Sequence, residues 1–196
     1  MRMTTFPLSS PSRRMSMTYA ALCVAGFGLA ANGGSSAAEP DIQNYGHDPF
    51  LHISSAVPDC PVPLGPAMRR AEWIADAHHR AEKGNSCWLE GRCRLPNSYA
   101  YDTEIAASAQ RRLDSLSGTM PWRTSTSLWL TFQRRIVVVQ GCVAPGFPTA
   151  ALIRSLGQTA DVENVVNQTV VRPGRAPLPY PTVERPDPVV LRAPSH

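Results

Sequence analysis

The stretch LWLTFQRRIVVVQGCV, from Leu128 to Val143, predicts two β-strands joined by a short turn. Apolar and polar residues alternate in its first half, as a strand with one buried face requires, and β-branched residues fill Ile136 to Val139 in its second half. The polar Gln-Arg-Arg sequence between the halves is short enough for a hairpin. Gly141 interrupts the second strand late, so we expect another group to pack closely against its backbone.

Two helices and a third strand flank this hairpin along the chain. Asp102 is a good N-cap for a helix that Gly118 ends, and Pro148 opens a shorter helix that Gly157 closes. The residues from Val162 to Val171 then predict the last strand. The positions expected to be buried on the two helices are Ile105, Ala109, Leu113, Leu116, Leu152, Ile153 and Leu156. Helices packed on one face of a three-stranded sheet form a two-layer α+β sandwich.

The order helix, strand, strand, helix, strand over residues 102–171 resembles the BON domain, a small module of bacterial periplasmic and envelope proteins. Besides the order of elements, the resemblance is carried by Gly141 and Val143 in the second strand and by Val162, Val165 and Asn167 in the third. It covers about 70 of the 196 residues. The resemblance implies binding to phospholipid or to envelope partners, and it implies neither catalysis nor a cofactor.

The first 38 residues have the layout of a bacterial secretion signal. Arg2, Arg13 and Arg14 are followed by an apolar run from Tyr19 to Ala31 and by small residues up to Ala38, where we expect cleavage. The run is shorter than the roughly 20 apolar residues of a membrane span, and no second candidate follows, so the mature chain is expected to have no transmembrane span. Loss of three arginines leaves 16 basic and 15 acidic residues, which does not favour nucleic-acid binding. The expected location is periplasmic or secreted.

The mature chain would contain four cysteines, an even number that fits two disulfides in an exported protein. Four cysteines allow three pairings. We favour Cys87 with Cys93, which closes the loop CWLEGRC, and Cys60 with Cys142, which joins the front segment to the sheet.

Residues 60–101 form a segment with one clear predicted helix, which has Pro66 in its first turn and ends before Gly84. Its weakly apolar face consists of Ala67, Ala71, Ile74, His78 and Ala81. We expect His78 to pack on this face and His79 to face water. A metal site that combines these histidines with Cys87 is the alternative, but structural zinc sites usually have cysteines two to four residues apart, and the spacing here fits poorly. No metal is therefore predicted.

Two further segments predict no fixed structure. Residues 39–59 are expected to be a flexible linker between the leader and Cys60. Residues 172–196 contain seven prolines, and because proline lacks an amide proton we expect a disordered, extended tail. A ligand for a proline-binding partner is the alternative role of this tail.

The chain contains no glycine-rich phosphate loop, serine elbow or HExxH pattern, so we expect a binding protein without catalytic residues or cofactors. The expected contacts with anionic phospholipid are Trp122 and Trp129 as amphipathic rings and Arg134 and Arg135 as headgroup partners. For Trp129, simple packing on the sheet is the alternative. A periplasmic adaptor that binds another envelope protein through a sheet edge or the tail is the second functional class. The sequence leaves the oligomeric state open.

Overall fold

The computed structural model describes residues 41–172, 174 and 176–187, which all belong to the unit formed by residues 39–196. The expected leader and its cleavage point at Ala38 lie outside the described residues. Within the described ranges, none of the helices has the length and apolar character that crossing a membrane requires.

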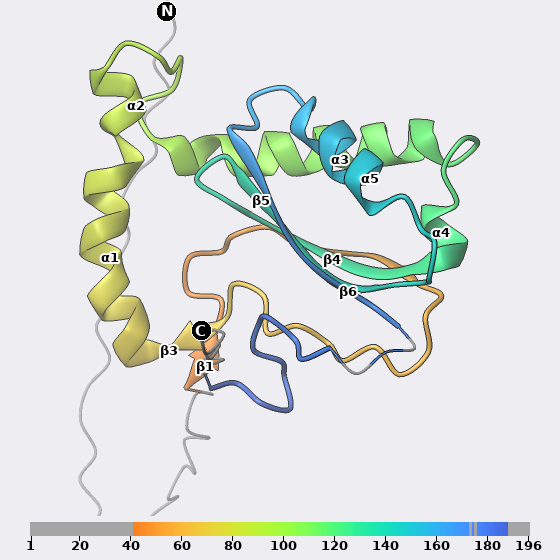
Figure 1. The fold of residues 1–196 in the computed structure, drawn as a ribbon. Helices are drawn as coiled ribbons and strands as arrows, with labels where there is room; N and C mark the ends of the chain where they lie inside the picture. Colours follow the sequence, from red (N-terminus) through yellow and green to blue (C-terminus); the bar gives the residue numbers. More distant parts are fainter. Residues whose placement is uncertain (1–40, 173, 175, 188–196) are drawn as a thin grey trace, which may run out of the picture. The chain divides into compact units, whose positions relative to one another are not determined.

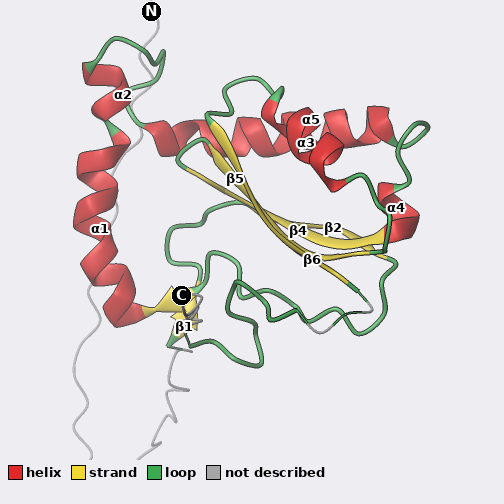
Figure 2. Ribbon diagram, viewed as in Figure 1, coloured by secondary structure: helices red, strands yellow, loops and turns green. Residues whose placement is uncertain are grey.

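The elements form one mixed four-stranded sheet, a small separate ribbon and several helices (Figures 1 and 2). In chain order they are β1 (Ile42–Gln43), β2 (Phe50–Ser55), β3 (Met68–Arg69), α1 (Arg70–Gly84), α2 (Ser86–Leu89), the 3-10 helix η1 (Ser98–Tyr101), α3 (Asp102–Leu116), α4 (Trp122–Ser125), β4 (Thr126–Gln133), β5 (Ile136–Val143), α5 (Thr149–Gly157) and β6 (Asn164–Val171). The sheet order is β2-β4-β5-β6, in which β5 and β6 run parallel and the other pairs antiparallel. β1 pairs with β3 in the ribbon.

The α+β class is confirmed, and the two helices and three strands predicted over residues 102–171 are present in the predicted order. The structure adds the short helix α4 before β4 and a fourth strand to the sheet. β2 lies inside the expected linker and pairs with β4 from Phe50 opposite Thr131 to Ser55 opposite Ser127. Leu51 of β2 also packs against the main core. The prediction of a flexible linker is therefore wrong for this stretch. β2 pairs with the side of β4 that would otherwise be a free edge of the sheet.

The main core lies between the sheet and the helices α3 and α5, which occupy the same side of the sheet in Figure 1. Its fully buried aliphatic and aromatic side chains include Ile105, Ala109, Leu113, Leu128, Leu130, Phe132, Val137, Val139, Leu152 and Leu156. The predicted buried faces of both helices are thus confirmed, with Leu116 and Ile153 half-buried against the same core. Trp122 of α4 closes one end, where its indole N–H donates to the carbonyl of Leu113 at 2.9 Å.

The opposite face of the sheet is covered by irregular segments, including residues that we expected to be a disordered tail. Tyr180 is only 2 % exposed, and Leu178 packs against a second cluster that includes Cys142. The amide of Leu64 donates to the carbonyl of Pro181 at 2.9 Å. Residues 178–182 are therefore packed, because prolines keep their carbonyl acceptors and the amides between them still pair. The last residues, 188–196, lie outside the described part.

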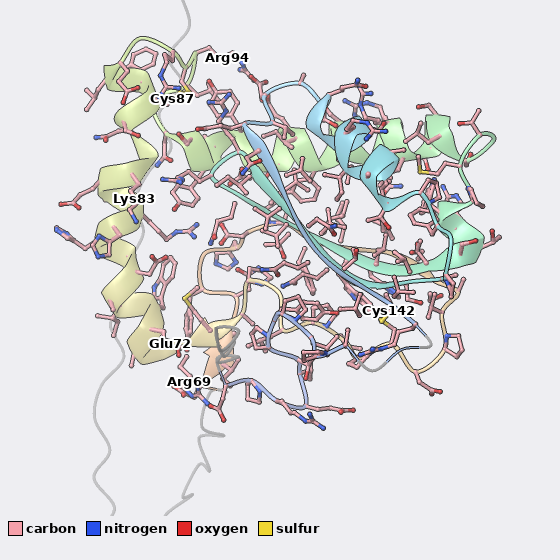
Figure 3. All side chains as sticks on the ribbon, viewed as in Figure 1. Arg69, Glu72, Lys83, Cys87, Arg94 and Cys142 are labelled. Atoms are coloured by element: carbon pink, nitrogen blue, oxygen red, sulfur yellow. A yellow bond between two sulfur atoms is a disulfide. The ribbon has the colours of Figure 1, made fainter. Side chains whose placement is uncertain are left out.

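Both favoured disulfides are present, Cys60 with Cys142 and Cys87 with Cys93. The first connects the segment after β2 to strand β5 across 82 residues of sequence, and the second closes a loop of six. Cys142 and Cys87, one from each bridge, are labelled in Figure 3. Because Cys87 is disulfide-bonded, it is not available for the alternative metal site.

The predicted packing face of α1 is wrong. Ile74 is 63 % exposed, and the exposed His78 lies 3.2 Å from the carboxylate of Glu82. The helix instead packs through Arg80, whose guanidinium donates to both carboxylate oxygens of the buried Asp48, at 2.9 and 2.6 Å. The same guanidinium lies 3.9 Å from the ring centroid of Tyr99. Apolar periodicity gave the wrong face because this contact is made by an ion pair and a cation–π interaction.

Candidate functional site

The turn between β4 and β5 is a two-residue loop of unusual composition. Gln133 pairs with Ile136, which leaves Arg134 and Arg135 as the loop, with φ angles of 54° and 66°. Loops with two left-handed residues normally contain asparagine, aspartate or glycine, because other side chains are strained there. Here the carboxylate of Asp102 accepts both loop amides, from Arg134 at 2.7 Å and from Arg135 at 2.8 Å. A helix residue thus fixes the conformation of the hairpin.

This contact changes the role expected for Asp102. The residue is the first of α3 rather than its N-cap, a position that Tyr101 occupies without a side-chain cap. The Asp102 side chain is 2 % exposed. Burial raises its pKa from the ordinary value of 3.8 to about 6, while the amide hydrogen bonds from Arg135 and Arg134 act in the opposite direction.

We expect the pKa of Asp102 to produce a pH-dependent stability. Since this acid holds its proton more strongly in the folded chain, its contribution to stability is complete below pH 4 and is lost as the pH rises to about 6. About two pKa units correspond to a loss on the order of 2 to 3 kcal/mol. Urea unfolding at pH 4, 5, 6 and 7 would measure it. In Asp102→Asn this component should disappear, and a variant with the wild-type pH profile would contradict the assignment.

Arg135 is held inside the fold. Its Nε donates to the carbonyl of Asp161 at 2.8 Å, and its guanidinium lies 3.6 Å from the carboxylate of Glu163. The same group reaches the sulfur atoms of Cys87 and Cys93, at 3.2 and 3.1 Å. The side chain is only 16 % exposed. We therefore do not retain Arg135 as a headgroup partner, because its guanidinium is already engaged with the chain.

The two candidate tryptophans are also buried. Trp122 is fully inside the main core, so it is not available for surface contact. Trp129 is 7 % exposed, and its ring stacks on His52 of the neighbouring strand β2, with centroids 4.4 Å apart and planes 9° from parallel. The alternative of packing on the sheet therefore describes Trp129 better than a contact with lipid.

Arg134, in contrast, lies at a groove between α1 and the sheet. The groove has a volume of about 340 Å³. Among the described residues, its guanidinium has neither a hydrogen bond nor an ion pair. Burial raises the pKa of Tyr99, and the charges of Arg80 and Arg134 act in the opposite direction. The residues that line the groove are Asp76, His79, Lys83, Tyr99, Gln133, Arg134, Ile136, Val138 and Val166.

The lining of this groove is amphipathic. Ile136, Val138 and Val166 supply apolar surface from β5 and β6, and all three are half-buried. Arg134 and Lys83 supply positive charge, and Lys83 is labelled on α1 in Figure 3. The sequence analysis identified Arg134 but not Lys83 or His79. Their spacing of four residues places them on one helix face, but nothing in the sequence indicates that this face lies beside the hairpin.

The residues on which the family resemblance rests have different positions in the fold. Gly141 has φ 124°, and a Cβ atom there would lie 2.1 Å from the carbonyl oxygen of Ser127, so the expected close backbone approach is confirmed. Val143 is buried in the main core, and Val162 and Val165 are half-buried against it. Asn167 is exposed, and its side-chain oxygen accepts a hydrogen bond from the amide of Thr169 at 3.1 Å.

The geometry leaves one retained contact residue from the sequence analysis, Arg134, beside cationic and apolar groups that only the fold brings together. In comparisons with protein-family models, curated proteins and solved structures, the chain gave no match.

Proposed function

We propose that this chain is a non-catalytic binding protein of the bacterial envelope that holds an anionic amphiphile, such as a phospholipid, in the groove beside the β4–β5 hairpin. The observation that carries the proposal is the guanidinium of Arg134, which has no partner in the described part of the chain and lies next to half-buried apolar side chains. A cation beside an apolar surface matches a molecule that has a negative headgroup and a hydrocarbon chain.

The charges of the groove favour an anion. Arg134 and Lys83 are positive, and Asp76 is the single acidic residue in the described lining. The hydrocarbon part of the ligand would lie against Ile136, Val138 and Val166. Removal of this apolar surface from water contributes about 25 cal/mol per Å².

The resemblance to the BON domain supports the same function. It covers α3, β4, β5, α5 and β6, and it implies contacts with phospholipid or envelope partners. The two disulfides are compatible with an extracytoplasmic location, because such bridges persist in oxidising compartments. A periplasmic or secreted location, after cleavage near Ala38, is part of the proposal.

Flotation of the chain with lipid vesicles tests the function. Vesicles that contain phosphatidylglycerol are expected to carry the protein, and vesicles of pure phosphatidylcholine are not. Arg134→Glu should weaken binding about tenfold or more, because each basic residue near an anionic surface contributes about 1 kcal/mol and the substitution reverses a charge.

The matched control is Arg154→Glu. Arg154 is exposed on α5, on the other side of the sheet, and no hydrogen bond or ion pair engages it among the described residues. The control makes the same change in net charge but lies away from the groove, so its binding to anionic vesicles should be close to that of the wild type. Equal binding by Arg134→Glu and Arg154→Glu, or equal binding of both vesicle types by the wild type, would contradict the proposed site.

A second candidate function is that of a protein-binding adaptor, and the position of β6 favours it. β6 is at one edge of the sheet, and no other described strand pairs with its outer side. Val171 at its end is 50 % exposed. An edge of this kind can accept an added strand from a partner protein. If the chain pulled down an envelope protein and did not float with any vesicle, the result would favour this second function.

A further inference from the structure

The disulfide between Cys87 and Cys93 lies against a cation. One nitrogen of the Arg135 guanidinium, Nη1, is 3.2 Å from the sulfur of Cys87 and 3.1 Å from the sulfur of Cys93. The hydrogen bond from Nε of Arg135 to the carbonyl of Asp161 holds the guanidinium in this place. Arginine stays charged in proteins, so a fixed positive charge faces both sulfur atoms. A neutral disulfide gains little from that charge, whereas a thiolate would be stabilised by it.

The loop that this bridge closes has hydrogen bonds of its own. The amides of Arg92 and Cys93 both donate to the carbonyl of Cys87, at 2.9 and 3.2 Å. Gly91 supplies the left-handed residue of the turn, with φ 70°. None of these hydrogen bonds uses a sulfur atom. When the S–S bond opens, the loop therefore still holds the two cysteines near each other, and the bridge can form again.

The two sulfur-bearing residues differ in their access to solvent. Cys87 is only 3 % exposed, whereas Cys93 is half-buried. Residues 88–92 and Arg94 are all exposed, so Cys93 lies in an accessible part of the loop. An external thiolate would therefore attack Cys93, and Cys87, beside Arg135, would be the leaving group.

The surroundings of the Cys60–Cys142 bridge are different. Cys142 is fully buried and packs with Val57 and Val170 in an apolar cluster. The sulfur of Cys60 lies 3.7 Å from the carbonyl oxygen of Ser127, whose partial negative charge would repel a thiolate. In the part of the chain that the structure describes, no cationic side chain contacts either sulfur. Apolar surroundings disfavour a thiolate, so this bridge should resist reduction.

We propose that Cys87–Cys93 is a site of reversible thiol–disulfide exchange with an external dithiol, and that Arg135 promotes its opening by stabilising the thiolate of Cys87. A thiolate of the dithiol attacks the sulfur of Cys93, the S–S bond breaks, and its electron pair leaves with the sulfur of Cys87. The second sulfur of the dithiol then attacks the mixed disulfide, which frees Cys93 and closes the dithiol into its own disulfide. Two electrons pass from the dithiol to the bridge, and of the two protons that it loses, one goes to Cys93 and the other to water.

Equilibration of the full chain with reduced and oxidised dithiothreitol at pH 7 tests the proposal. Acid quenching, alkylation and peptide mass spectrometry give the reduced fraction of each bridge separately, so Cys60–Cys142 is the internal control. Cys87–Cys93 is expected to be half reduced at a ratio of reduced to oxidised dithiothreitol about tenfold or more below the ratio that Cys60–Cys142 requires. Opening of both bridges at the same ratio, or of Cys60–Cys142 first, would overturn the proposal.

Arg135→Gln separates the effect of the charge from a structural effect. Without the charge, the Cys87 thiolate is less stable, so the bridge should require about a fivefold or higher ratio of reduced to oxidised dithiothreitol. A merely structural role predicts the opposite, because a loosened fold holds the bridge less firmly and makes it easier to reduce. Arg135→Lys, which keeps the charge, should fall between the wild type and Arg135→Gln. An unchanged or lower ratio in Arg135→Gln would contradict the role of Arg135.

The matched control is Arg94→Gln. Arg94, labelled in Figure 3, follows Cys93 in the sequence, but it is exposed and paired with Glu104 and Asp161 rather than with a sulfur atom. The substitution removes the same charge from the same loop, and since an exposed charge is screened by solvent, the ratio should change by less than about twofold. No lipid enters these measurements, so their outcome is independent of the groove beside the hairpin.

Discussion

Replacement of Gly141 by alanine is expected to lower the free energy of unfolding by more than about 4 kcal/mol, a size of effect that single substitutions rarely reach. The new Cβ would lie 2.1 Å from the carbonyl oxygen of Ser127 and 3.0 Å from Cα of Leu128. Both atoms belong to the backbone of the paired strand β4, so no side-chain rotation relieves the overlap. The φ angle of 124° adds strain of its own, because residues with a Cβ rarely adopt it.

Urea unfolding followed by tryptophan fluorescence measures this effect, since Trp122 is fully buried in the folded chain. A typical domain has only about 5 to 15 kcal/mol of stability, so Gly141→Ala should be largely unfolded in modest denaturant. The control is Gly118→Ala, where a Cβ meets no atom within 4 Å, and its change should stay within about 0.5 kcal/mol. A wild-type unfolding midpoint for Gly141→Ala would show that β4 and β5 are not paired as described.

The two disulfides are expected to contribute very unequally to stability. A bridge stabilises mainly by restricting the unfolded chain, and the restriction grows with the length of the loop that it closes. Cys60 and Cys142 are 82 residues apart, so Cys60→Ala/Cys142→Ala should cost about 4 to 5 kcal/mol. Cys87 and Cys93 are six residues apart, and their double alanine variant should cost about 2 kcal/mol.

Denaturant unfolding of both double variants, without reductant, gives the comparison. The first bridge also has a packing role, because Cys142 is fully buried beside Val57 and Val170. The second bridge touches the guanidinium of Arg135, so its removal should loosen the hairpin end of the fold first. Equal losses of stability in the two variants would contradict the dependence on loop length.

Local sequence patterns predicted the part of the fold in which pattern and packing agree. The alternation around Leu128 and Leu130 and the helical spacing of Ile105, Ala109 and Leu113 lead directly to buried positions. Each of these elements buries one apolar face against the same core, so its periodicity reports its packing. The cysteine pairing was also predictable, because one pair closes a short loop and leaves one partner for each remaining cysteine.

Other features were not predictable because their partners are distant in the sequence. β2 is a six-residue strand whose pairing with β4 spans more than 70 residues, and nothing near Phe50 indicates it. The described tail packs through Tyr180 and backbone hydrogen bonds, which its proline content obscures. Asp102 has the composition of a helix cap, yet its carboxylate bonds the hairpin loop.

The candidate site was predicted only in part for the same reason. Arg134 and Arg135 are adjacent and chemically identical in the sequence, but the fold engages one guanidinium and leaves the other beside a groove. Residues of α1 join Arg134 only through tertiary packing.

The pairing of β2 with β4 limits where a protease can cut the chain without harm to the sheet. A protease that cut after Ser55 would release the strand that shields one flank of β4, together with Leu51 and Ile53, which rest on the core. The shortened product would expose the free amides and carbonyls of β4 at the edge of the sheet. Such an edge promotes self-association and fibril growth. Maturation upstream of Ile42 would avoid this hazard.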